Sequence, residues 1–200
     1  MRLENFKTLT WADFFLYSII DPRALMRRII QREPDPFWLS FVVPAASALF
    51  SMLTLSLMGR QSSFFYHKMS YGWIFVFMVT IVLVFVYSSM VDAVAQAYGL
   101  GGRVKHLIPL INFSFMPQLF ILPALYPFIV GNFAPFFFYV AASIAAFIWR
   151  ILIVVQGISE MHSIDFGRAL VIFILPAVAL FVSLFLALIM LVTMIVSFLS

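Results

Sequence analysis

The stretch ALVIFILPAVALFVSLFLALIMLVTMIVSF, residues 169–198, contains no charged side chain and decides the fold class of the chain. Four further long apolar runs precede it, at residues 37–58, 72–97, 107–130 and 134–158. About 20 consecutive apolar residues form a helix that crosses the hydrocarbon core of a bilayer. The sequence therefore predicts an all-α integral membrane protein with five transmembrane helices. The last run is longer than one span requires, so its helix must tilt or be split at Pro176.

The composition excludes the soluble classes of protein. Hydrophobic residues make up 64% of the chain and charged residues only 10%, which is too little polar surface for a soluble domain of this size. Because the spans are joined by short loops, we expect any activity to reside inside or beside the membrane. The absence of cysteine excludes disulfides, thiolate catalysis and cysteine-based metal sites.

Positive charge is distributed unequally along the chain, which predicts its orientation. Half of the 12 Lys and Arg residues lie within residues 1–35, before the first span. Further cations occur in the loops around 101–105 and 159–168, and two occur at 59–71, whereas the loop at 131–132 and the C-terminus have none. Because cations mark the cytoplasmic side, we expect the N-terminus inside and the C-terminus outside. We also expect the first span to stay attached, because no cleavage site for a leader is apparent.

Residues 1–35 are interpreted as a basic arm, distinct from the transmembrane domain of residues 36–200. Asp21-Pro22 predicts a helix start, because Asp favours the N-cap and Pro the first helical position. The residues that follow are amphipathic, so we expect a helix at the cytoplasmic membrane surface. Its apolar side comprises Leu25, Met26, Ile29 and Ile30. The cations expected to contact the anionic inner leaflet are Arg23, Arg27, Arg28, Arg32, Arg103 and Lys105.

Two patterns concern the packing of the spans. Small side chains gather in the first span, around residues 45–56, and in the fourth, around residues 141–146, and they predict the packed centre of the bundle. The third span contains Pro109, Pro117, Pro123 and Pro127, so its helix should be kinked or interrupted. Such a break is either a bend shaped by packing or part of a binding site, as in transporters.

Charged and polar side chains within the spans are the candidate functional residues. Asp92 and Arg150 both fall in the cytoplasmic half of the membrane and are predicted to form an intramembrane pair. Alternatively, Arg150 extends to the inner headgroups, or the two residues take part in transport. The possible polar lining of such a pathway comprises Ser88, Gln96, Asn112 and Gln118.

Enzyme motifs are not apparent. The spacing of His106, Glu160 and His162 matches no zinc signature, so we expect no metal and no cofactor. A nucleophile elbow and a P-loop are also missing from the sequence. We therefore expect a protein that is not an enzyme, and an intramembrane lipid enzyme using Glu160, His162 and Asp165 is the remote alternative.

Three stretches of this chain resemble the Yip family of five-span membrane proteins, most closely its short bacterial members. They are DPRALMRRIIQREPDPFW, AYGLGGRVKHLIPLINFSFMP and IWRILIVVQGISEMHSIDFGRALVIFILP. The resemblance implies a cytoplasmic N-terminus, an opposite C-terminus and, for a bacterial-type member, the inner membrane. Eukaryotic members bind prenylated Rab-type GTPases, which a bacterial-type member would not meet. The family has no assigned catalytic residues to carry over.

The sequence leaves two functional hypotheses. The first is a nonenzymatic membrane protein that scaffolds or organises other membrane components through helix packing and its basic arm. Its expected partners are anionic inner-leaflet lipids and either a membrane protein or further copies of itself, with no nucleic acid. The alternative is a transporter or channel for lipid or a small solute, using the interrupted third span with Asp92 and Arg150.

Overall fold

The computed structural model describes residues 11–31, 35–59 and 63–199, and all regular secondary structure in these ranges is helical. Five segments are long and apolar enough to cross a membrane, which confirms the predicted fold class. These segments are Pro36–Met58, Tyr71–Ala97, Val104–Val130, Pro135–His162 and Phe166–Met194. The helices are α1 (Ala12–Ile20), α2 (Pro22–Gln31), α3 (Pro36–Ser40), α4 (Val42–Met58), α5 (Ser63–Ala97), α6 (Val104–Phe113), α7 (Met116–Leu119), α8 (Ile121–Val130), α9 (Pro135–His162) and α10 (Phe166–Leu199).

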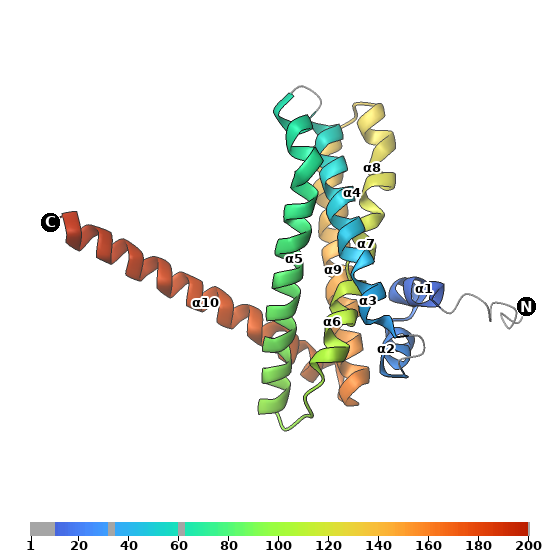
Figure 1. The fold of residues 1–200 in the computed structure, drawn as a ribbon, viewed down its shortest axis with the longest axis vertical. Coiled ribbons are helices and arrows are strands. Elements are labelled where there is room, and N and C mark those ends of the chain that lie inside the picture. The colour runs from blue at the N-terminus through green and yellow to red at the C-terminus, as the bar shows by residue number, and fades with distance from the viewer. Residues whose placement is uncertain (1–10, 32–34, 60–62, 200) are drawn as a thin grey trace, which may run out of the picture.

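The first four spans stand side by side as an upright bundle (Figure 1). The first span comprises α3 and α4, and the third comprises α6, α7 and α8 stacked end to end (Figure 1). Long helices form here because in hydrocarbon every backbone N–H and C=O must find its partner within the segment. The helices α1 and α2 lie beside the end of the bundle from which α10 departs.

The third span is interrupted twice, as its prolines predict. The first break follows Phe113 and the second follows Leu119. These residues lie four positions before Pro117 and Pro123, where the proline ring crowds the preceding carbonyl group. Backbone hydrogen bonds between residues three apart bridge the breaks. The Phe115 amide donates to the Asn112 carbonyl, and the Phe120 amide donates to the Pro117 carbonyl. Pro109 and Pro127 lie inside α6 and α8 without ending them.

The packed centre lies in α6 and differs in part from the prediction. Every residue from Leu107 to Phe115 is buried, because α6 is surrounded by α2, α3, α5 and α9. In the first span, Ser47 and Ala48 are buried as expected. In the fourth, only Ala146 of the predicted small residues is buried. Most of the small side chains at residues 141–146 of α9 are therefore not buried. Large apolar side chains of α6 fill the core instead.

The arm is part of the same core. The Asp21 carboxylate accepts hydrogen bonds from the amides of Arg23 and Ala24, which confirms the predicted N-cap of α2. Phe14 of α1 stacks on Phe113 of α6, with ring centroids 5.7 Å apart. The apolar side of α2 is buried against α9 and α6 rather than free to enter lipid; it comprises Leu25, Met26 and Ile29, while Ile30 is exposed.

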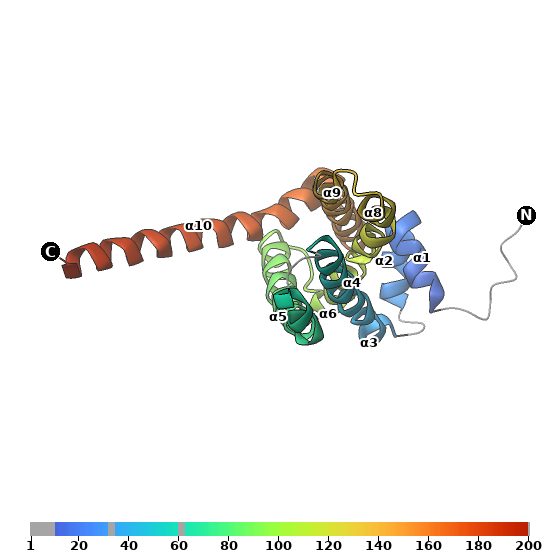
Figure 2. The same ribbon diagram turned by 90° about the horizontal axis from the view of Figure 1, so that it is seen from above.

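The fifth span leaves the bundle. Ala169 and Ile172 near the start of α10 are buried, and α10 packs there against α5 and α9. Beyond this point the helix projects away from the other spans (Figures 1 and 2). It continues through Pro176 without a break, so the predicted split at this proline does not occur, and the tilt stays a prediction. With 34 residues it is about 51 Å long, whereas the hydrocarbon core is about 30 Å thick.

Candidate functional site

Asp92 holds the loop between α5 and α6 in place. Its side chain is only 4% exposed. One carboxylate oxygen accepts a hydrogen bond from the backbone amide of Arg103, and the other accepts one from the Gln96 side chain at 2.6 Å. The Arg103 guanidinium donates in turn to the Met161 carbonyl at 2.7 Å, which ties the loop to the end of α9. Asp92 is therefore a buried acceptor that organises one end of the bundle.

The glycines of this loop fit that arrangement. Gly99 has a φ of 78° and ends α5, and the Leu100 amide then donates back to the Ala95 carbonyl. This is the left-handed helix end that glycine favours. A Cβ on Gly102 would lie 2.7 Å from Nε2 of Gln96 and 3.2 Å from a carboxylate oxygen of Asp92. A larger residue at position 102 would therefore displace the Gln96 side chain that donates to the Asp92 carboxylate.

Arg150 has different partners, so the predicted pairing with Asp92 is wrong. Among the described residues, the ion pairs are Arg27–Glu160, Arg28–Asp13 and Arg168–Asp165. The Arg150 guanidinium carbon lies 3.5 Å from the centroid of the Phe115 ring, and its Nε donates to the Ser114 hydroxyl at 3.3 Å. The pairing fails because the first break in the third span supplies Ser114 and Phe115 as partners to Arg150, while the Asp92 carboxylate accepts hydrogen bonds from the loop backbone and from Gln96.

The predicted polar lining is also dispersed. The Asn112 amide donates to the Ser40 hydroxyl at 2.9 Å, and the Ser47 hydroxyl donates to the Gln118 side chain. Both contacts tie the third span to the first. Ser88 is fully buried, and its hydroxyl has no hydrogen-bond partner among the described residues. These side chains therefore do not line one continuous polar pathway with Asp92 and Arg150.

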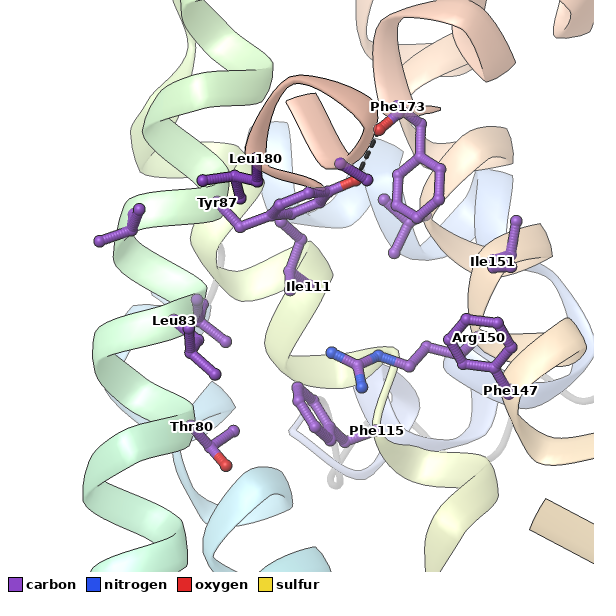
Figure 3. A pocket seen from close by; sticks show the side chains of 14 residues that line it. Thr80, Leu83, Tyr87, Ile111, Phe115, Phe147, Arg150, Ile151, Phe173 and Leu180 are labelled. Carbon is purple, nitrogen blue, oxygen red and sulfur yellow. Dashed lines mark hydrogen bonds between the residues drawn. The ribbon is translucent and has the colours of Figure 1, made fainter. Parts of the chain in front are cut away.

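A cavity of about 460 Å³ lies between α5, α6, α9 and α10. Figure 3 shows the Arg150 guanidinium directed into it from α9, beside Phe115. The Tyr87 hydroxyl lies at its other end and donates to the Phe173 carbonyl, drawn as a dashed line (Figure 3). Most of the lining is apolar, from residues such as Leu83, Ile111, Phe147 and Ile151. An apolar chamber of this size with one cation is large enough for part of a lipid or a small organic anion.

Some cations of the arm and the inner loops form contacts within the protein, and others are exposed. Arg28 contacts the Asp13 carboxylate at 2.6 Å and lies 4.9 Å above the Tyr17 ring. Arg27 lies 3.6 Å from Glu160 and is otherwise exposed. Arg23, Arg103 and Lys105 are also exposed, and Arg32 lies outside the described residues. Contact of these exposed cations with anionic headgroups stays a prediction.

Of the three residues considered for enzyme chemistry, Glu160 and Asp165 form contacts with arginines. Glu160 pairs with Arg27, and Asp165 accepts a hydrogen bond from the Arg168 amide at the start of α10. The imidazole Nε2 of His162 is buried without a hydrogen-bond partner in the described part of the chain. Within that part, no group of three His, Cys, Asp or Glu side chains could hold a metal ion.

The cavity was not predicted from the sequence, although Arg150 was. Tyr87 directly precedes Ser88 and breaks an otherwise apolar segment, which is the one signal that could have drawn attention to it. Phe115 and Ile111 look like ordinary apolar residues of a span, and their role depends on the break after Phe113. Phe173, Ala177 and Leu180 of α10 also line the cavity, and no local pattern encodes the path of this helix past α5 and α9.

Comparison with known proteins agrees with the architecture. The family model of the Yip1 domain matches residues 16–198, which is nearly the whole chain and includes part of α1 and all five spans. Searches of curated proteins and of solved structures found no match. The chain is therefore an integral membrane protein that belongs to the Yip1 domain family.

Proposed function

We propose that this protein is a nonenzymatic membrane scaffold that assembles with a second copy of itself through α10. The observation that carries the proposal is the exposure of this helix. Every described side chain from Ala177 to Thr193 is exposed, whereas the other spans each pack against neighbours within the bundle. A helix held away from its own bundle is available to a partner in the plane of the membrane.

Exposure to lipid does not itself drive association, because lipid tails are as apolar as leucine. Small side chains do favour it, since they let two helix backbones approach closely. On the exposed part of α10, Ala179, Ser183 and Ala187 are spaced four residues apart and lie on one face. The bulky Phe181 and Phe185 point to the opposite side of the helix.

A second copy is the partner that best fits this face. A two-fold axis brings the same surface of each copy together, so one self-complementary stripe is sufficient for assembly. Two α10 helices crossing near Ser183 would place their small residues in contact. The exposed cations Arg23, Arg27, Arg103 and Lys105 support a further contact with anionic lipid at the inner surface.

Cross-linking in native membranes tests the assembly, because the chain has no cysteine of its own. Ser183→Cys should give a dimer with a short bismaleimide, because the two introduced thiols would lie across the helix crossing. Phe185→Cys is the matched control, since it lies at nearly the same depth but on the other face. Equal cross-linking at both positions, or none at Ser183→Cys, would contradict assembly through this face.

A second candidate function is movement of a lipid or small solute, which the cavity around Arg150 supports. Reconstituted liposomes test it by lipid scrambling or solute flux. Flux should fall in Arg150→Gln and remain in Asp92→Asn, because Asp92 belongs to a loop contact away from the cavity. Flux that is the same in protein-free and protein-containing vesicles would remove this candidate.

A further inference from the structure

The Arg150 side chain carries a charge that the protein does not neutralise. Among the described residues it has no carboxylate within ion-pair distance, and one hydrogen bond, from Nε to Ser114, engages its guanidinium. The other N–H groups of the guanidinium have no acceptor there. The ring of Phe115 offsets part of the cost of burying the charge, since a cation over an aromatic face is attracted to it.

The position of Arg150 makes this cost large. It lies 12 residues before His162, the last residue of α9, which is about 18 Å along the helix. An ionised group inside a membrane span is usually paired, directed to an aqueous path, or part of a binding site. Arg150 does not extend along α9 toward the membrane surface, because its guanidinium turns inward over Phe115 (Figure 3).

The lining of the cavity in front of Arg150 suits a ligand with an anionic head and an apolar chain. Its walls are apolar except for Thr80, Tyr87 and Arg150. The Thr80 hydroxyl donates to the Val76 carbonyl and the Tyr87 hydroxyl donates to the Phe173 carbonyl, so Arg150 supplies the free donors. Leu83, Phe147 and Leu180 line the cavity and are also exposed on the surface of the helices, so the cavity opens toward the surrounding hydrocarbon.

We infer that this cavity binds a membrane amphiphile through its anionic headgroup. A phosphate or carboxylate oxygen accepts hydrogen bonds from the terminal nitrogens of Arg150, and the acyl chain leaves between Leu83 and Phe147 into the bilayer. Guanidinium groups match both oxyanions, often with two parallel hydrogen bonds. The site goes beyond assembly through α10 and does not depend on it.

Native mass spectrometry of the purified full-length chain tests this inference with three probes: dioleoylphosphatidylglycerol, oleate and the uncharged lipid diolein. We expect the protein to retain phosphatidylglycerol or oleate and to release diolein. Retention of phosphatidylglycerol alone identifies a phosphate ligand, and retention of oleate alone identifies a carboxylate ligand. Retention of all three with the same affinity would overturn the inference, because charge would then play no part.

Substitutions at Arg150 test the contact itself. Arg150→Gln keeps a polar side chain but removes the charge, and should weaken binding of the anionic probe by at least about tenfold, as loss of a charge-assisted hydrogen bond does. Arg150→Lys should retain part of the affinity because it keeps the charge without the planar fork. Arg168→Gln is the control, since Arg168 is an exposed cation outside the cavity and its loss should not change binding.

A second variant keeps the test decisive if Arg150→Gln fails to fold. Leu83→Trp enlarges an exposed side chain at the cavity opening and leaves Arg150 in place. It should reduce retention of the anionic probe at least about tenfold by filling the path of the acyl chain. Binding that is unchanged in Leu83→Trp, or in a folded Arg150→Gln variant, would show that the lipid binds elsewhere and would overturn the inference.

Discussion

Gly157 of α9 lies against the side chain of Leu110 in α6 so closely that a Cβ on Gly157 would overlap both methyl groups of the leucine. Leu110 is fully buried and has little room to move away. The missing side chain at residue 157 thus sets the separation of the third and fourth spans. This contact belongs to the core on which α2, α6 and α9 converge.

Gly157→Ala should lower the free energy of unfolding by about 1–3 kcal/mol, the usual cost of overpacking a tight core. Thermal unfolding of the detergent-solubilised protein measures the effect. Adding Leu110→Ala should restore part of the loss by making space for the new methyl group. Gly101→Ala is the control, because a Cβ there has no neighbour within 4 Å. Similar destabilisation by Gly101→Ala would remove the steric explanation.

Asp92→Ala should release the loop between α5 and α6. The carboxylate accepts hydrogen bonds from the Arg103 amide and from Gln96, and an unsatisfied buried donor costs about 1–3 kcal/mol. Hydrogen exchange of the Arg103 amide should therefore accelerate. Asp92→Asn should show a smaller acceleration, since its carbonyl oxygen can still accept one hydrogen bond. Unchanged exchange in Asp92→Ala would argue against this contact.

Substitutions at two neighbouring isoleucines of α2 test whether the arm packs on the bundle or inserts into lipid. Ile29 is 1% exposed, and Ile30 is 37% exposed. Ile29→Ala should lower the free energy of unfolding by about 2–5 kcal/mol, as truncation in a core does. Ile30→Ala should stay within about 0.5 kcal/mol, as changes at surface positions do. Melting temperatures in detergent compare the two, and equal effects would show that the arm does not pack as described.

Ala187→Phe should prevent assembly through α10, because a large ring in the small-residue stripe keeps two helix backbones apart. Fluorescence size-exclusion chromatography in mild detergent should show a shift from dimer to monomer. Leu188→Phe is the matched control, since it places the same ring one position along, away from the stripe. A dimer that survives Ala187→Phe would place the interface elsewhere.

Five spans would put the two ends of the chain on opposite sides of the membrane, and the cation distribution predicts the N-terminus inside. Cysteines added at the two ends should therefore differ in their reaction with an impermeant maleimide in intact cells. The C-terminal thiol should react, and the N-terminal thiol should react only after the membrane is opened. The reverse result would invert the proposed orientation.

Much of the fold could be predicted because the bilayer imposes simple local rules. Apolar runs such as 169–198 must form helices in hydrocarbon, and Pro117 and Pro123 break the third span at the positions their ring sterics require. The Asp21 cap of α2 is equally local, since it involves amides two and three residues away.

The candidate site was less predictable, because its contacts join distant parts of the chain. The sequence placed Arg150 and Asp92 in the same half of the membrane, which made a pair reasonable, but this does not determine which side of a helix faces which neighbour. Arg150 instead meets Ser114 and Phe115, 36 and 35 residues earlier in the sequence. The small residues of the fourth span likewise indicate that close packing is possible without specifying where it occurs.

The sequence by itself determined the class of the protein, the number and approximate positions of its spans, the breaks in the third span and the amphipathic character of its arm. Each of these depends on hydrophobicity or backbone sterics over short distances. Only the tertiary structure decided that the arm joins the core at Phe113, that Asp92 and Arg150 have separate partners, and that α10 leaves the bundle beside an open cavity. These features depend on how helices rotate and pack against one another, and many helix pairings satisfy the same apolar pattern.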